Sequence, residues 1–224
     1  MTLATWTALV TAVVVISLTP GAGAVNTMTN SISQGWRRSF WGVLGQQIAL
    51  IIQLTIVAVG VGAIVAAVPA VLTAVRWIGA AYLVYLGVRM LLARPVVPSA
   101  PEHQELDTST TSDGTVPAKK RPGYESAWGM IRRGILVNLL NPKAIVFFLA
   151  FIPPFIRPDQ PQLPQYLIIG VTCVVVDVIV MWFGFALLAK PLGRLMHTMR
   201  GQRILNTIFG LCFIAVAGLL LLLH

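Results

Sequence analysis

The chain has 224 residues, of which 57% are hydrophobic and only 10% are charged, and its mean hydropathy is +0.83. This balance excludes an ordinary soluble domain and indicates an integral membrane protein that crosses the bilayer several times. The formal net charge of +9 would suggest nucleic-acid binding in a soluble protein. In a membrane protein we expect it to report topology instead, with no nucleic-acid partner.

A membrane-spanning helix needs about 20 apolar residues, and six stretches of the chain meet this requirement. They lie near residues 3–25, 40–68, 70–92, 127–155, 165–189 and 204–223. Most of the 16 Lys and Arg residues fall in the connections after the first, third and fifth stretches. Because basic loops tend to stay in the cytoplasm, we expect both termini on the outer side of the membrane.

The first stretch contains the sequence Thr19-Pro20-Gly21, which predicts a break inside the span. Thr19 is a good N-cap and Pro20 a good first helical residue, so we expect a second half-helix to begin here. No basic residue precedes the apolar run, which argues against a cleaved signal peptide. The second half is too polar to face lipid and should line the protein interior or a wet cavity. Its polar residues include Asn26, Thr27, Asn30 and Ser33.

The second stretch carries small and polar residues at helical spacing. They are Gly42, Gln46, Ala49, Gln53 and Gly60. Residues at this spacing share one helix face, and such a face should contact other helices rather than lipid. The pattern leaves two interpretations open, because the stripe could join neighbouring helices or line a pore.

The fourth stretch is interrupted by the sequence NLLNPK at residues 138–143. Pro142 removes a helical hydrogen bond and should end the incoming helix, and Asn141 should cap a second half-helix that starts at Pro142. Lys143 then lies beside a helix N-terminus, and two positive features inside a membrane need an anion. We count Asn138 among the candidates for that site.

Asp177 is the one acidic residue inside the predicted spans, and Lys143 is the one basic residue at similar depth. Each charge is expensive in hydrocarbon, so both should face the bundle interior. One interpretation is a permanent salt bridge between Lys143 and Asp177. The other is a site that exchanges these partners for a substrate or a proton. An amino acid zwitterion offers a carboxylate for Lys143 and the half-helix N-termini, and an ammonium for Asp177.

An internal repeat relates the third stretch to the sixth, since Gly79 and Gly87 correspond to Gly210 and Gly218. The two proline breaks also fall at corresponding places. Three spans per half would reverse the second half in the membrane. We therefore expect an all-α integral membrane protein with six transmembrane helices, arranged as two inverted three-helix repeats with broken helices 1 and 4. The repeats would cover residues 1–92 and 126–224, joined by a flexible cytoplasmic linker at residues 93–125.

Five short motifs occur in order along the chain. They are LTPGAGAVNTMT at 18–29, GAAYL at 79–83, VNLLNPK at 137–143, QPQL at 160–163 and VVD at 175–177. Together they resemble the lysine-exporter superfamily, and within it the exporters of homoserine, homoserine lactone and threonine. The resemblance implies a secondary exporter of small neutral amino acids in the bacterial cytoplasmic membrane, driven by proton antiport, with no cofactor and no metal.

Two positions depart from the pattern of that superfamily. Ala22 stands where the wider family often has proline, and Gln53 stands where histidine is expected in close relatives. Because a glutamine side chain does not titrate, Asp177 is the better proton-coupling candidate. The substrate-binding candidates are Thr19, Pro20, Gly21, Asn26, Gln46, Gln53, Asn138, Asn141, Pro142 and Lys143.

Other functions stay open at this point. The chain could export another amino acid, such as leucine or lysine, or it could be a small-ion or cation efflux carrier, although a divalent cation prefers several oxygen ligands. An intramembrane enzyme is disfavoured, because no His, Cys, Asp or Glu cluster within the predicted spans has metal-site or nucleophile spacing. The expected partners are an amino acid, protons and the lipid bilayer, and the sequence leaves a homo-oligomer open.

Overall fold

The computed structural model describes residues 1–67, 69–93, 124–157, 159–196 and 198–222, and every regular element within these ranges is helical. The linker predicted at 93–125 lies almost entirely outside the described residues. The helices are α1 (Leu3–Leu18), α2 (Ala22–Gln34), α3 (Trp36–Ala67), α4 (Pro69–Leu92), α5 (Ala127–Leu139), α6 (Pro142–Phe151), the 3-10 turn η1 (Pro153–Phe155), α7 (Gln162–Val178), the π-helix η2 (Ile179–Ala186), α8 (Ala189–Met196) and α9 (Met199–Leu222).

Three helical segments are long and apolar enough to cross a membrane by themselves: Trp36–Gly60, Gln162–Ala186 and Met199–Gly218. Two further pairs, α1 with α2 and α5 with α6, are long and apolar enough to cross a membrane only if the two helices of the pair are counted as one span. Each pair is bent by 58°. The described residues therefore provide three to five candidate spans, and α4 adds a shorter apolar helix, Trp77–Leu92. The arrangement of six spans in two inverted repeats stays a prediction.

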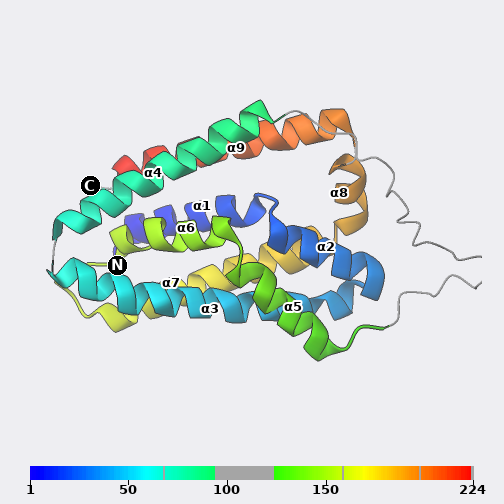
Figure 1. Ribbon diagram of the computed structural model, residues 1–224, viewed down its shortest axis with the longest axis horizontal. Coiled ribbons are helices and arrows are strands. Elements are labelled where there is room, and N and C mark those ends of the chain that lie inside the picture. Colours follow the sequence, from blue (N-terminus) through cyan, green and yellow to red (C-terminus); the bar gives the residue numbers. More distant parts are fainter. Residues whose placement is uncertain (68, 94–123, 158, 197, 223–224) are drawn as a thin grey trace, which may run out of the picture.

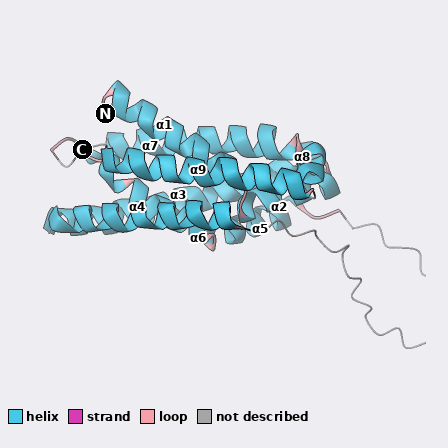
Figure 2. Ribbon diagram, turned by 90° about the horizontal axis from the view of Figure 1, so that it is seen from above, coloured by secondary structure: helices cyan, strands magenta, loops and turns pink. Residues whose placement is uncertain are grey.

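The helices form an elongated bundle in which α1 begins and α9 ends at the same end (Figure 1). The α2 C-terminus and α8 lie at the opposite end, and Figure 2 shows the same arrangement from above. Arg37 and Arg38 at the start of α3, and Lys190 and Arg194 on α8, belong to this second end. These basic residues thus gather at one end of the molecule.

The α4 and α9 helices lie side by side along one edge of the bundle and pack mainly on each other. A Cβ atom at Gly87 would lie 2.7 Å from the carbonyl oxygen of Gly210, and a Cβ at Gly210 would lie 2.8 Å from that of Gly87. Real Cβ atoms do not approach so closely, so the two glycines are what allow these backbones to touch.

A second close crossing joins α3 to α5, again at glycines. A Cβ at Gly45 would collide with the carbonyl oxygen of Ile131, and a Cβ at Gly134 would collide with that of Gly42. Both obstacles are backbone atoms, which cannot rotate away as a side-chain tip can. This crossing holds α5, and with it the α5–α6 break, against α3.

We expect Gly45→Ala to destabilise the protein by about 1–3 kcal/mol, because the added methyl group overpacks a backbone contact. Gly60→Ala is the matched control, since Gly60 lies in the same helix and has open space where the Cβ would go. The measurement is the midpoint of thermal unfolding in detergent for both variants. Equal midpoints for the two variants would show that the crossing tolerates a side chain.

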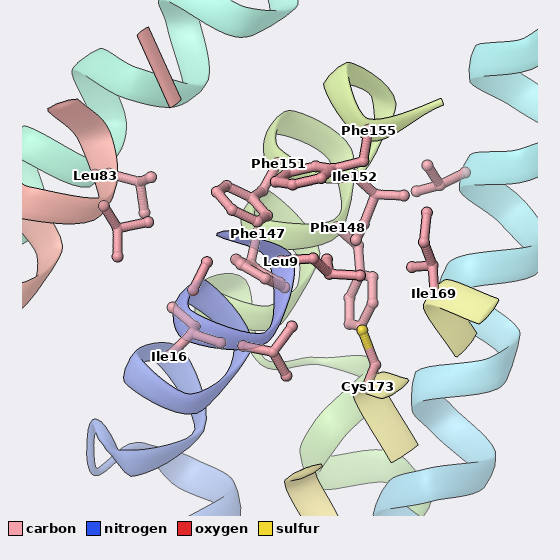
Figure 3. Close-up of a cluster of buried hydrophobic side chains, with 14 of the residues drawn as sticks. Leu9, Ile16, Leu83, Phe147, Phe148, Phe151, Ile152, Phe155, Ile169 and Cys173 are labelled. Atoms are coloured by element: carbon pink, nitrogen blue, oxygen red, sulfur yellow. The ribbon is translucent and has the colours of Figure 1, made fainter. Parts of the chain in front are cut away.

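An apolar core fills the space between α1, α6 and α7 (Figure 3). Phe151 stacks on Phe147 and packs at a tilt against Phe155, with ring centroids 4.8 Å apart in each pair. Leu9 of α1 and Ile169 of α7 are fully buried beside these rings. The core ends where α1 stops and α6 begins, and polar side chains gather there.

Candidate functional site

The break between α1 and α2 differs from the expected geometry. Thr19 is the C-cap of α1 rather than an N-cap, and its hydroxyl donates to the carbonyl of Val15 at 2.8 Å. Gly21 is the N-cap of α2, which starts at Ala22, so Pro20 is not the first helical residue. The prediction for these two residues was wrong, because the threonine hydroxyl found an acceptor in the preceding turn. Among the described residues, no side chain forms a cap hydrogen bond at the start of α2.

The break between α5 and α6 follows the sequence prediction. Asn141 is the N-cap of α6, with its side chain accepting from the Lys143 amide at 3.2 Å, and Pro142 is the first helical residue. Both assignments are confirmed. The first turn of α6 carries no acidic residue, so its N-terminal dipole is not balanced by a carboxylate within that turn.

Lys143 links the two breaks. Its ammonium donates to the backbone carbonyls of Ile16 at 2.8 Å and Thr19 at 2.6 Å. These carbonyls belong to the last turn and C-cap of α1, where the helix dipole is negative and cations are favoured. A Cβ at Gly21 would lie 3.5 Å from the Lys143 Nζ. The lysine charge is therefore held by neutral acceptors immediately beside the start of α2.

Asp177 has neutral partners of its own. Its carboxylate accepts from the Ser17 hydroxyl at 2.9 Å and from the Gln47 side-chain amide at 2.7 Å. Although Lys143 and Asp177 both belong to the described part of the chain, they form no ion pair with each other. The structure thus contradicts the interpretation of this pair as a permanent salt bridge, because each charge is satisfied by helix ends and polar side chains.

Both charged residues line one cavity of about 60 Å³ between the two breaks. Ligand pockets for small molecules usually measure roughly 300–1,000 Å³, so an amino acid could enter only if the surrounding helices moved. The lining combines polar groups with an apolar wall. Its polar members are Ser17, Gln46, Asn138, Asn141, Lys143 and Asp177, its backbone members Gly21 and Gly23, and its apolar members include Leu50, Phe147, Phe148 and Met181.

Gln46 and Asn138, which line this cavity, also form hydrogen bonds that join the surrounding helices. The Gln46 amide donates to the carbonyl of Gly23 at 3.2 Å and to the hydroxyl of Thr27 at 2.9 Å. The Asn138 amide in turn donates to the backbone carbonyl of Gln46 at 3.0 Å. These bonds connect α2, α3 and α5, so the two helix breaks are fixed relative to each other.

The remaining candidates lie outside the cavity lining. Gln53 donates to the backbone carbonyl of Asn138 at 3.1 Å and so joins α3 to α5, which is the helix-joining role left open by the sequence. Asn26 is buried further along α2. Neither Asn26 nor Pro142 lines the cavity that contains Lys143 and Asp177. Pro20 lines a separate apolar cavity of about 180 Å³ together with Phe185 and Leu188.

Ser17 and Gln47 are the site residues that sequence reasoning missed. They contact Asp177 across separations of 160 and 130 residues, and no local pattern encodes such contacts. One signal was present, since Gln47 follows Gln46 directly and lies about 100° around the helix from it, at 3.6 residues per turn. A second polar face of the same helix could have been inferred from that pair.

The π-helix η2 begins two residues after Asp177 and is bonded to the start of α3. The indole of Trp36 donates to the carbonyl of Trp182 at 3.1 Å, the indole of Trp182 donates to the carbonyl of Trp36 at 3.2 Å, and the two rings stack at 4.9 Å. Ser31 on α2 donates to the carbonyl of Ala186 at 2.5 Å. Wider helical turns are rare and frequently lie at functional sites, and here the turn adjoins the half-buried carboxylate of Asp177.

Apolar helices around a cavity with one lysine and one aspartate define a multi-pass helical membrane protein with a polar site inside the bundle. Residues 14–224 match the family model of the LysE type translocators. The chain therefore belongs to the LysE type translocator family, and the predicted resemblance is confirmed. The family name and the names of its relatives indicate a transporter rather than an enzyme.

Two curated bacterial relatives match nearly the whole chain, and a third matches a shorter part of it. A homoserine/homoserine lactone efflux protein from Salmonella typhi is 38% identical over 98% of this chain and 97% of that protein. An uncharacterized membrane protein from Vibrio cholerae is 36% identical over 96% of this chain and 95% of that protein. A leucine efflux protein from Salmonella choleraesuis is 29% identical over 70% of this chain and 65% of that protein. No solved structure gives a significant match.

Proposed function

We propose that this protein is a secondary active exporter of small neutral amino acids, with homoserine, homoserine lactone and threonine as expected substrates and protons as the coupling ion. The observation that carries the proposal is the separation of Lys143 from Asp177 inside one cavity. Each charge holds only neutral partners, so each can exchange them for a charged group of a substrate. The printed names of relatives as homoserine/homoserine lactone and leucine efflux proteins support an amino acid as cargo.

A zwitterionic amino acid matches the polar groups of the cavity. Its carboxylate would take the Lys143 ammonium and the uncapped amides at the start of α2, an arrangement that favours anions. Its ammonium would take the Asp177 carboxylate. Both replacements exchange a neutral partner for a charged one, and charge-assisted hydrogen bonds are roughly twice as strong as neutral ones. The substrate side chain would face the apolar wall that includes Leu50 and Phe148.

Proton coupling follows from the chemistry of a single carboxylate. Asp177 can bind the substrate ammonium or a proton, but binding of one weakens binding of the other, because each neutralises the same charge. If the carboxylate reorients across the membrane only when it is neutralised, substrate leaves in exchange for a proton. The site then acts as an antiporter without a second titratable group.

Each bent helix pair forms one broken span in this proposal, and α4 completes a set of six spans in two inverted three-helix repeats. Broken helices at corresponding places of two repeats are typical of transporters that bind substrate near the middle of the membrane. The small volume of the present cavity fits a conformation in which the site is closed around its own polar groups.

The orientation in this proposal places both termini outside the cytoplasm, because the basic end of the bundle should face the cytoplasm. A periplasm-active reporter fused after the last residue should be active, and a cytoplasm-active reporter fused at the same place should be silent. Fusions within the linker at 93–125 should give the opposite result. A C-terminal fusion that is active only in the cytoplasm would overturn this topology.

Counterflow exchange in proteoliposomes tests the proposed function. Vesicles loaded with unlabelled homoserine should take up labelled homoserine from outside, and threonine and leucine should be tested in parallel. Exchange of leucine alone would favour the second candidate, a leucine exporter, which the apolar wall of the cavity and the leucine efflux relatives support. An ion current without amino acid exchange would contradict both candidates.

A further inference from the structure

A second group of polar side chains lies toward the basic end of the bundle, where α2 ends and α5 begins. We call it the entrance cluster, and it consists of Asn30 on α2, Arg38 on α3, Glu125 before α5 and Arg133 on α5. Asn30 lies seven residues beyond Gly23, which is about 10 Å along the α2 axis at 1.5 Å per residue. The cluster is therefore separate from the central cavity but close to it.

Glu125 occupies the middle of the entrance cluster. Its carboxylate pairs with the Arg133 guanidinium at 2.8 Å, and its backbone carbonyl accepts from Arg38 at 2.8 Å. Arg133 also donates to the side-chain oxygen of Asn30. The arginine and the glutamate are 42% and 29% exposed, respectively. The pair can thus be reached from that end of the molecule.

The cluster contains more hydrogen-bond donors than acceptors. Four buried donors within or beside it have no partner in the described structure: Asn26 Nδ2, Asn30 Nδ2, Arg38 Nε and Arg133 Nε. Asn30 is completely buried, and its amide packs against the Cα of Gly42. Buried donors are rarely left unpaired, because each one costs about 1–3 kcal/mol. A site with unused donors around one carboxylate suits a further anionic acceptor.

Polar groups connect this cluster with the central cavity. On α2, Asn30 is followed toward the cavity by Thr27 and Asn26 and then by Gly23, at helical spacing and all buried. On α5, Arg133 precedes Asn138, which lines the cavity, by five residues. The α2 helix therefore carries a buried row of polar groups from the cluster to the cavity, as expected for the route of a polar solute, whereas on α5 only Arg133 and Asn138 mark its two ends.

We propose that Arg133, which Asn30 holds in place, forms a first binding site for the substrate carboxylate, and that Glu125 occupies this site when substrate is absent. The inference rests on the proposed export of amino acids and names a further substrate-binding site for it. The guanidinium fork is suited to carboxylates in two-point geometry. An incoming amino acid would displace the Glu125 carboxylate from Arg133, while the Asn30 side-chain oxygen would keep its hydrogen bond with the guanidinium.

The test compares homoserine with homoserine lactone, which has an ester carbonyl in place of the carboxylate. In proteoliposomes, Arg133→Gln should raise the KM for homoserine by about tenfold or more, as expected for the loss of a charge-assisted hydrogen bond. It should change the KM for the lactone much less. Glu125→Gln should lower the KM for homoserine, because the competing carboxylate is gone. Arg132→Gln is the matched control, since Arg132 is the exposed neighbour of Arg133.

Equal changes in KM for homoserine and the lactone in Arg133→Gln would overturn the proposal and make Arg133 a structural residue. An unchanged or raised homoserine KM in Glu125→Gln would overturn the competition between the two carboxylates. If Arg133→Gln does not fold, Arg133→Lys keeps the charge without the fork and should show the same difference between the substrates. Failure of the proposed function would look different, since the wild type would exchange neither compound.

Discussion

Asp177→Asn should abolish pH-gradient-driven accumulation of homoserine while leaving exchange of homoserine between equal concentrations. The amide preserves the shape of the side chain but cannot titrate. It can also keep both hydrogen bonds, because the Gln47 carbonyl oxygen has no partner in the described structure and can accept from the amide if the Gln47 side chain flips. The rate of gradient-driven transport should fall on the order of 100-fold or more, as is typical when a proton-transferring group is lost.

Ser17→Ala is the matched control for this variant. It removes the 2.9 Å hydrogen bond to Asp177 but leaves the titratable carboxylate in place. We expect slower transport that is still driven by the pH gradient. Accumulation and equal-concentration exchange should be measured on the same vesicle preparations. Gradient-driven accumulation by Asp177→Asn at the wild-type rate would show that protons are coupled elsewhere.

Lys143→Met should reduce amino acid export by roughly 10- to 100-fold, which corresponds to the 1.5–3 kcal/mol of a hydrogen bond to a charged group. Methionine fills a similar volume but cannot bind the substrate carboxylate. The change also removes the bonds to the carbonyls of Ile16 and Thr19. We therefore expect a lower unfolding midpoint in detergent, with protein still inserted in the membrane.

The double variant Lys143→Met with Asp177→Leu separates a working site from a structural pair. If the two residues served only to neutralise each other, removing both charges would restore function, because an apolar pair can replace a buried ion pair at little cost. Since Lys143 and Asp177 hold different partners in the structure, we expect the double variant to remain inactive. Recovery of gradient-driven export in that variant would contradict the assigned roles.

Local sequence rules predicted the cap residues correctly at the α5–α6 break and incorrectly at the α1–α2 break, although α1 does end where the sequence predicted a break. At Asn141 and Pro142 the outcome depends on adjacent residues, because a proline at the first helical position and an asparagine cap reinforce each other. At Thr19 a competing acceptor lay one turn back, in the carbonyl of Val15. A threonine hydroxyl can satisfy either role, and the sequence does not indicate which.

The partners of the two charged residues in the cavity could not be predicted for a different reason. Charge alone suggested that Lys143 and Asp177 pair, because Asp177 is the one acidic residue inside the predicted spans and Lys143 is the one basic residue at similar depth. The structure instead places Lys143 at the C-terminal carbonyls of α1, and Asp177 beside Ser17 and Gln47. These contacts depend on how the broken helices pack, which helical periodicity does not encode. Periodicity did identify the interior face of α3, where Gln46 lines the cavity.

The alternate binding of substrate and proton at Asp177 is the central claim, and proton movement during substrate exchange tests it most directly. Proteoliposomes are loaded with a pH-sensitive dye and homoserine is added outside, with no initial pH gradient. We expect the interior to become alkaline in wild-type vesicles, because each entering homoserine is exchanged for a departing proton. Vesicles with Asp177→Asn should show no such change. Entry of labelled homoserine into wild-type vesicles without any proton movement would contradict the claim.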